Sequence, residues 1–329
     1  MRAFEFASPT SKDQVSALLG SQWGEVEILA GGTDLVSLMK DDITTPHRLV
    51  NIKGIKELRG VNLGKDLVSI GALTTLADIA DDATLKKQYP ALAEAANDAA
   101  SPQIRNLATL GGNLCQRPRC WYFRSGHGLL AQGANGKSLV LEGDNRYHAI
   151  LGNDGPAYFV SPSTVAPVLI AYRATVTIQG PKGAREVPLE KFFVIPKTEQ
   201  EREHDLQPNE IVTEVILPGK TPGPVHAAIY EVRQKEAFDW PYATAAVALT
   251  MNGDSVSSAR VVMGHVAPVP WISAEAAEAL AGKNITAESA DAAAKAAVAK
   301  AKSLGHNTHK IQLAQVAVKR AILKAGEQK

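Results

Sequence analysis

The short stretch at residues 30–35, Ala-Gly-Gly-Thr-Asp-Leu, constrains the fold of this chain more than any other. It follows an apolar run at 26–29 that predicts a strand, and it precedes a run at 35–39 that predicts a short helix. Two adjacent glycines at such a corner let the backbone adopt positive φ and approach a ligand without an intervening Cβ. Successive amides, with the positive end of the helix behind them, predict a cradle for a phosphate or pyrophosphate. The simpler alternative is a tight turn in which Asp34 is an N-cap.

A second glycine pair follows at residues 109–113, Thr-Leu-Gly-Gly-Asn. Two such corners, each flanked by hydrogen-bonding side chains, predict that the chain binds two parts of one extended ligand. A dinucleotide is a ligand of that kind. The chain has neither G-x-G-x-x-G nor G-x-x-x-x-G-K-[ST]. A dinucleotide would therefore be held by a fold other than a Rossmann or P-loop fold.

Three stretches taken together resemble one known family: AGGTDL, PQIRNLATLGGNL at 102–114 and RVVMGHVAPVPW at 260–271. They are similar to the FAD-binding medium subunits of molybdenum hydroxylases, such as xanthine dehydrogenase, carbon monoxide dehydrogenase, aldehyde oxidoreductase and 4-hydroxybenzoyl-CoA reductase. The matching stretches occur in the same order as in the family, and the resemblance extends over residues 1–325. It implies an α+β fold, in which a two-lobed FAD-binding domain of the PCMH (vanillyl-alcohol-oxidase-like) type precedes a small α+β domain.

The resemblance also implies a cofactor site. In the family, the first corner wraps the FAD pyrophosphate with backbone amides, and the second lies against the pyrophosphate and flavin from the other side. The corresponding cofactor-binding residues here are Leu29, Ala30, Gly31, Gly32, Thr33, Asp34, Leu35, Thr109, Gly111, Gly112, Asn113, Thr164 and Asp239. No catalytic side chain and no metal ligand is expected, because a flavin supplies its own reactive atoms.

The chain departs from the family at two of its expected flavin contacts. Thr164 stands where many relatives have an aspartate that helps to hold FAD, and Glu231 stands where they tend to have a lysine. A glutamate would oppose the anionic reduced flavin, and Arg233 or Lys235 is expected to compensate. Asp239 is interpreted either as a buried acid near the flavin or as a hydrogen-bonded turn acid before a proline.

The resemblance implies an electron-transfer function within a complex. A molybdenum-pterin large subunit would oxidise the organic substrate, and a small 2Fe–2S subunit would pass electrons to the FAD of this chain. The FAD would then deliver them to a terminal acceptor. Two alternatives remain: a flavin-free scaffold or assembly subunit of the same complex, and a nucleotide-binding module without a redox role.

Composition excludes other classes. The chain has 329 residues and a net charge of +1, which gives no reason to expect binding to nucleic acid or to an anionic membrane. Two cysteines argue against a disulfide scaffold, and the first residues do not resemble a signal peptide. We expect a soluble, cytoplasmic protein; export as a passenger with a signal-bearing partner stays open. Glycines and prolines at 219–224 predict a boundary between domains 1–221 and 222–329.

A long insertion is expected at residues 115–155. Its basic segment, residues 116–124, contains Arg117, Arg119, Arg124 and three consecutive aromatic residues. We expect this segment to be a solvated or partner-facing surface rather than a nucleic-acid site. Some relatives hold a 4Fe–4S centre in this loop, through a cysteine matching Cys120 and three later ones. No cysteine follows Cys120 here, so the sequence predicts that this centre is absent.

Local patterns predict the individual elements. Ser11 and Gln14 resemble a capping box for a helix at 12–19, and Pro90 opens a helix to about residue 100. Residues 163–171 fit either a helix or a strand. The C-terminal domain is expected to contain three strands, at 225–232, 243–251 and 256–266, followed by helices at 274–280, 289–302 and 310–324.

Overall fold

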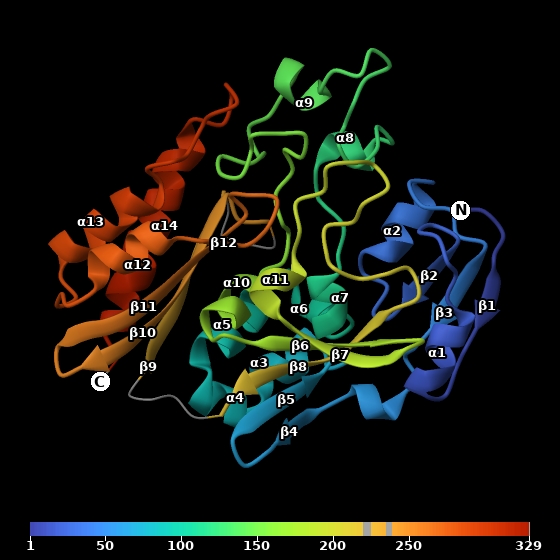
Figure 1. Cartoon of the computed structure of the whole chain (residues 1–329), viewed down its shortest axis with the longest axis horizontal. Helices are drawn as coiled ribbons and strands as arrows, with labels where there is room; N and C mark the ends of the chain where they lie inside the picture. The colour runs from blue at the N-terminus through green and yellow to red at the C-terminus, as the bar shows by residue number, and fades with distance from the viewer. Residues whose placement is uncertain (220–224, 235–238, 329) are drawn as a thin grey trace.

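A computed structural model describes residues 1–219, 225–234 and 239–328 of the chain, in three bodies that lie side by side with an irregular insertion above them (Figure 1). The first lobe contains a parallel sheet in the order β1-β3-β2. Its elements are β1 (Glu5–Ala7), α1 (Lys12–Leu18), β2 (Val26–Leu29), α2 (Leu35–Lys40) and β3 (Arg48–Asn51). The expected capping box is wrong: the Ser11 side chain makes no cap bond, and Thr10 instead donates its amide to Gln14 Oε1 over 2.9 Å.

The second lobe contains a five-stranded antiparallel sheet in the order β4-β5-β8-β6-β7. The sheet comprises β4 (Val61–Leu63), β5 (Leu67–Gly71), β6 (Thr175–Gly180), β7 (Gly183–Pro188) and β8 (Ile211–Pro218), with a 3-10 turn, η1 (Lys56–Leu58), before it. The helices of this lobe are α3 (Leu76–Asp81), α4 (Ala83–Gln88), α5 (Pro90–Asp98), α6 (Pro102–Arg105), α7 (Leu110–Leu114), α10 (Ala166–Ala171) and α11 (Leu189–Phe192). In the run at 163–171, which fitted either a helix or a strand, residues 166–171 are helical.

The C-terminal sheet has the order β12-β11-β10-β9, one strand more than expected. Its strands are β9 (Val225–Val232), β10 (Ala243–Asn252), β11 (Ser255–Gly264) and the two-residue β12 (Trp271–Ile272). One face packs on α5 and α10 of the second lobe, and the other packs on α12 (Ala274–Leu280), α13 (Ala287–Ala297) and α14 (His309–Gly326). The expected domain boundary at 221/222 lies outside the described residues.

The insertion contains the short helices α8 (Trp121–Arg124) and α9 (Leu139–Glu142) and is tied to the C-terminal domain. The buried Lys310 ammonium donates to the carbonyls of Tyr147, His148 and His265 over 2.9, 3.0 and 2.8 Å. Lys302 donates its amide to Ile150 over 2.7 Å, and this long-range bond explains why α13 ends at Ala297 instead of continuing to residue 302.

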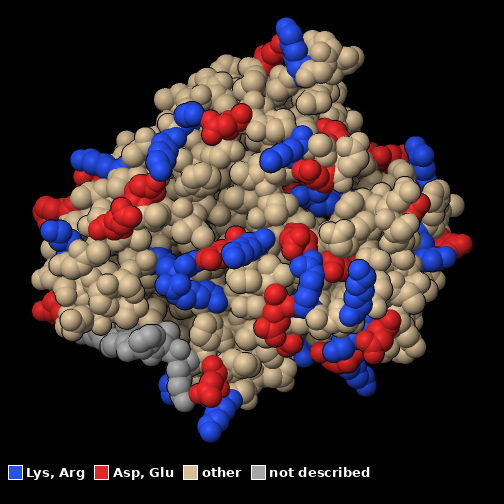
Figure 2. Space-filling model, in the orientation of Figure 1, with Lys and Arg blue, Asp and Glu red and all other residues tan. Residues whose placement is uncertain are grey.

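The exposed charges are mixed in sign. On the face shown in Figure 2, lysines and arginines lie among aspartates and glutamates, and no continuous basic surface extends over this face. In the described part of the chain, no helix is long and apolar enough to cross a membrane.

Candidate functional site

The first Gly-Gly corner lies between β2 and α2 and contacts the second lobe through its backbone. A Cβ on Gly31 would lie 2.0 Å from the carbonyl oxygen of Leu107, so only glycine fits there. Gly32 has a φ of +77°, which is a conformation that favours glycine. The two glycines thus serve different needs: the first permits contact between the lobes, and the second permits the turn.

The amides of this corner are available to a ligand. Within the described residues, Gly31, Gly32 and Thr33 donate their backbone N–H groups to no protein acceptor. All three residues line a cavity of about 780 Å³ between the first two lobes. Unpaired backbone donors facing a cavity favour an anionic ligand.

The second Gly-Gly corner differs in structure. It forms the first turn of α7, whose N-cap Thr109 accepts the Gly112 amide over 3.2 Å. The Gly111 amide donates to the Ala72 carbonyl over 2.9 Å. Both glycine amides therefore have protein acceptors, although both glycines line the large cavity.

Asp34 holds the basic segment and is not a side-chain cap. It occupies the position before α2 without a cap bond. Its carboxylate accepts the Arg117 amide over 2.9 Å, Arg119 Nη1 over 2.7 Å and Arg124 Nη2 over 2.7 Å. The side chains of these three arginines are only 19–23 % exposed. The expectation of a solvated surface is therefore wrong for these side chains, and the expectation that the segment faces a partner stays a prediction.

The aromatic residues of the basic segment pack within the insertion. The Trp121 ring lies 5.4 Å from Tyr147 and 5.8 Å from His148 in edge contacts, and Phe123 is buried beneath the guanidinium of Arg117. These contacts join separate parts of the insertion to one another.

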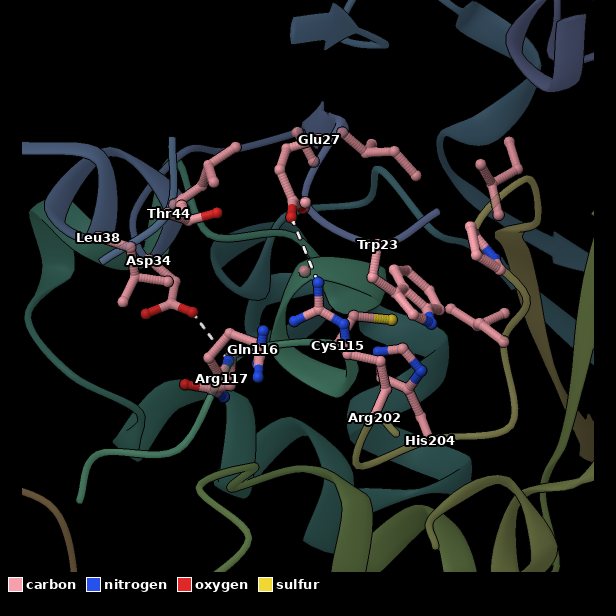
Figure 3. Close-up of a pocket in the computed structure, with 18 of the residues that line it drawn as sticks. Trp23, Glu27, Asp34, Leu38, Thr44, Cys115, Gln116, Arg117, Arg202 and His204 are labelled. Carbon is pink, nitrogen blue, oxygen red and sulfur yellow. Dashed lines mark hydrogen bonds and ion pairs between the residues drawn. The ribbon is translucent and has the colours of Figure 1, made fainter. Parts of the chain in front are cut away.

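The far end of the large cavity contains charged and aromatic residues that sequence patterns did not reveal (Figure 3). Arg202 lies 4.7 Å above the Trp23 ring and 3.6 Å from the Glu27 carboxylate. Burial raises the pKa of Glu27 to about 7, and the charge of Arg117 opposes this shift. His204 lies against Trp23, with the two ring centres 5.8 Å apart.

A second cavity of about 290 Å³ contains most of the remaining predicted residues. It is lined by Asn113, Thr164 and Asp239, together with Arg119 and Arg233. Thr164 is buried, whereas Asp239 is exposed, so the interpretation of Asp239 as a buried acid is wrong.

The two cavities share four lining residues, namely Thr33, Asp34, Gly112 and Gln116. Of the predicted site residues, all of which the structure describes, Leu29 alone lines neither cavity. All the other predicted residues thus line one or both of these neighbouring cavities.

Glu231 is neutralised by a neighbour. It forms an ion pair with Arg233, whose Nη2 also donates to the Asp98 carbonyl over 2.6 Å. Burial raises the pKa of Glu231 to about 7 despite this partner. Of the two cations expected to compensate, Arg233 thus pairs with Glu231, and Lys235 lies outside the described residues.

The two cysteines are free and do not pair with each other. Cys120 Sγ lies 3.1 Å from His148 Nε2, and burial raises the pKa of both thiols. Among the described residues, no group of three or more His, Cys, Asp or Glu side chains is placed to hold a metal ion. The absence of a 4Fe–4S centre stays a prediction that rests on the count of two cysteines.

Comparison with known proteins places this architecture in a family. Residues 2–220 match the FAD binding domain in molybdopterin dehydrogenase, and residues 228–325 match the CO dehydrogenase flavoprotein C-terminal domain. The carbon monoxide dehydrogenase medium chain of Hydrogenophaga pseudoflava is 31% identical over 323 residues, which cover 97% of this chain and 96% of that one. The aldehyde oxidoreductase FAD-binding subunit of Escherichia coli K12 is 31% identical, with 96% of each chain covered.

Solved structures agree with the sequence relatives. A carbon monoxide dehydrogenase structure from Hydrogenophaga pseudoflava superposes with a TM-score of 0.77 at 30% identity, covering 98% of this chain and 97% of that one. The α+β fold and the family expected from the three sequence stretches are confirmed. The chain therefore belongs to the family of FAD-binding flavoprotein subunits of the molybdenum hydroxylases.

Proposed function

We propose that this chain binds FAD across the two joined cavities and acts as the electron-transfer subunit of a molybdenum hydroxylase. The observation that supports this most directly is the set of free amides of Gly31, Gly32 and Thr33, because all three residues line the large cavity and Thr33 also lines the small one. A dinucleotide extending through both cavities would place its pyrophosphate beside these donors. The family match supports the same cofactor.

The residues present fit FAD in charge as well as in space. The Trp23 and Arg202 side chains offer an aromatic and cationic surface at one end of the large cavity. The small cavity offers the Thr164 hydroxyl, the Asn113 amide and the Arg233 guanidinium, which are hydrogen-bonding groups suited to a heterocycle. When bound, FAD supplies the redox chemistry, and these side chains hold and orient it.

In this proposal, electrons come from a 2Fe–2S partner subunit that is served by a molybdenum-pterin large subunit, and they leave to a terminal acceptor. Residues 1–221 form the FAD-binding domain and residues 222–329 form the C-terminal domain. The site residues are those of the two Gly-Gly corners together with Thr164 and Asp239. Two free thiols fit a reducing compartment such as the cytoplasm.

The first test is the flavin content of the purified chain. We expect a flavin absorption spectrum and the release of about one FAD per chain on denaturation, identified by chromatography. Protein without FAD, which also fails to take it up on incubation, would favour the flavin-free scaffold. Binding of a nucleotide other than FAD would favour the module without a redox role.

A matched pair of variants tests the placement of the site. Gly32→Val and Gly253→Val each put a branched side chain at positive φ, +77° and +57°, but Gly253 lies in the β10–β11 hairpin with nothing within 4 Å of its Cβ position. We expect folded Gly32→Val protein that has lost FAD, and folded Gly253→Val protein that retains it. Equal FAD content in the two variants would contradict the site.

The electron-transfer step is tested with the assembled complex. Co-expressed partner chains should reduce the FAD of this subunit when the organic substrate is added, which is followed as bleaching of the flavin absorption. A complex that turns over substrate while its flavin stays oxidised under anaerobic conditions would show that this chain is a scaffold.

A further inference from the structure

The basic segment, residues 116–124, lies across the junction of the two cavities. Gln116 and Asp34 line both cavities, Arg117 lines the large one and Arg119 lines the small one. A ligand that extends from one cavity to the other therefore passes the point where Asp34 holds the segment. The side chains at this point determine the charge that the middle of the ligand meets.

The junction carries an excess of positive charge. Asp34 Oδ1 accepts from two guanidinium groups, those of Arg119 and Arg124, each over 2.7 Å. Arg117 has its own carboxylate partner, Glu203, at 2.9 Å. One carboxylate is thus shared between two cations, and their combined charge favours a further anion nearby.

The two arginines that share Asp34 differ in how they face the site. Arg124 lines neither cavity, and it donates to the carbonyls of Pro118 and Arg117 over 2.9 and 3.1 Å. Arg119 lines the small cavity, and its Nε is buried without a hydrogen-bond partner. Because Arg119 lines a cavity and Arg124 does not, only Arg119 is placed to contact a ligand there.

Two further residues besides Asp34 hold the Arg119 guanidinium in position. Its guanidinium lies 4.7 Å from the centre of the Trp240 ring, and its Nη2 donates to Gln116 Oε1 over 2.8 Å. Asp34, Gln116 and Trp240 together hold the planar group in place before any ligand arrives. Such preorganisation reduces the entropy lost on binding.

We propose that Arg119 is a direct ligand of the FAD pyrophosphate, and that Asp34 acts as a positioning residue that holds this guanidinium at the cavity junction. The proposal rests on the proposed function, because it assumes that FAD is the dinucleotide bound. It adds a side-chain cation to the backbone amides of the first corner as the device that binds the diphosphate. A guanidinium is well suited to this task because its fork of N–H donors matches phosphate oxygens.

The test compares FAD affinity in wild-type protein, Arg119→Gln and Arg124→Gln after removal of bound flavin. Each variant removes one ion pair with Asp34, so the difference between them reports the contact with the ligand. We expect Arg119→Gln to weaken FAD binding about tenfold or more, and Arg124→Gln to weaken it distinctly less. Arg119→Lys should recover part of the loss. Thermal unfolding of each apoprotein checks that the fold is intact.

Salt dependence gives a second readout that a merely structural role would not change. The dissociation constant of FAD should rise with ionic strength in the wild type and in Arg124→Gln, and more weakly in Arg119→Gln, because a direct charge pair has been removed. The inference would be overturned if Arg119→Gln bound FAD with the affinity and salt dependence of the wild type. It would also be overturned if the two glutamine variants lost equal amounts of FAD affinity. A wild-type protein that binds no FAD would overturn the proposed function itself, and this inference with it.

Discussion

At the first Gly-Gly corner, the amides of Gly31 and Gly32 face the large cavity and have no acceptor among the described residues, whereas at the second the amides of Gly111 and Gly112 donate to Ala72 and Thr109. The first corner is an irregular turn, and the second is the start of a helix. Two stretches with nearly the same letters thus serve different purposes. The first leaves hydrogen-bond donors without protein acceptors at the cavity, and the second lets α7 pack closely against Ala72.

The largest expected difference between the corners is in stability. In Gly31→Ala, the new Cβ would lie 2.0 Å from the Leu107 carbonyl oxygen, and backbone cannot move aside cheaply. We expect it to lower the free energy of unfolding by about 3 kcal/mol or more. In Gly111→Ala, the nearest atom is Ala72 Cβ at 3.0 Å, and we expect a loss of about 1 kcal/mol. Urea unfolding of both variants measures the difference, and equal losses would contradict the structural contrast.

The next effect concerns the polar residue that flanks each corner. Asp34→Asn leaves Arg119 and Arg124 facing each other without a carboxylate between them, and we expect it to cost about 2 kcal/mol. Thr109→Ala removes only the side-chain cap of α7 and should cost about 1 kcal/mol. Thermal and urea unfolding in low and high salt distinguish the two variants, because only the stability loss of Asp34→Asn depends on charge. A salt-independent loss in Asp34→Asn would count against the ion pairs.

A smaller effect distinguishes the second glycine of each pair. Gly32→Ala places a Cβ at a φ of +77° and should cost about 1 kcal/mol, together with a loss of FAD affinity. Gly112→Ala gains helix propensity in α7, but its Cβ would lie 2.9 Å from the capping Thr109 Oγ1. We expect its stability to change by less than about 1 kcal/mol. A larger loss of FAD affinity in Gly112→Ala than in Gly32→Ala would reverse the comparison.

The last expected effect is a pH dependence in β2, the strand that leads into the first corner, since the Glu27 side chain is 23% exposed and lies 3.6 Å from Arg202. Burial raises the pKa of Glu27 from 4.5 to about 7, so the folded protein binds this proton more tightly than the unfolded chain. The Glu27 contribution should therefore reduce the free energy of unfolding progressively as the pH rises from about 4.5 to about 7. Urea unfolding of wild type and Glu27→Gln at several pH values measures this as their difference. A constant difference across that range would contradict the prediction.

Local patterns predicted most of the elements, because the residues that decide them are neighbours in sequence. The strand expected at 225–232 corresponds to β9, and the helix expected to begin at Pro90 corresponds to α5. The residues of both glycine pairs likewise line the large cavity. These features depend on backbone conformation, which the sequence controls over a few residues.

The features of the site that the sequence did not predict depend on contacts between residues far apart in the chain. The basic segment gave no sign that its arginines point inward, because their partner Asp34 lies 85 residues away from Arg119. The charged end of the large cavity joins Trp23 and Glu27 of the first lobe with Arg202, and no spacing rule connects them. The sequence left two interpretations of Asp239 open, and the structure shows that this residue is exposed.

The buried ammonium of Lys310 makes the insertion dependent on the end of the chain. Lys310 lies 163 residues after Tyr147, whose carbonyl it binds, so during synthesis the loop emerges long before its partner exists. A fragment ending at residue 221 would contain the loop and the basic segment but would lack this anchor. We therefore expect such a fragment to hold this loop less firmly than the whole chain does, because the Tyr147 and His148 carbonyls would lack the Lys310 ammonium.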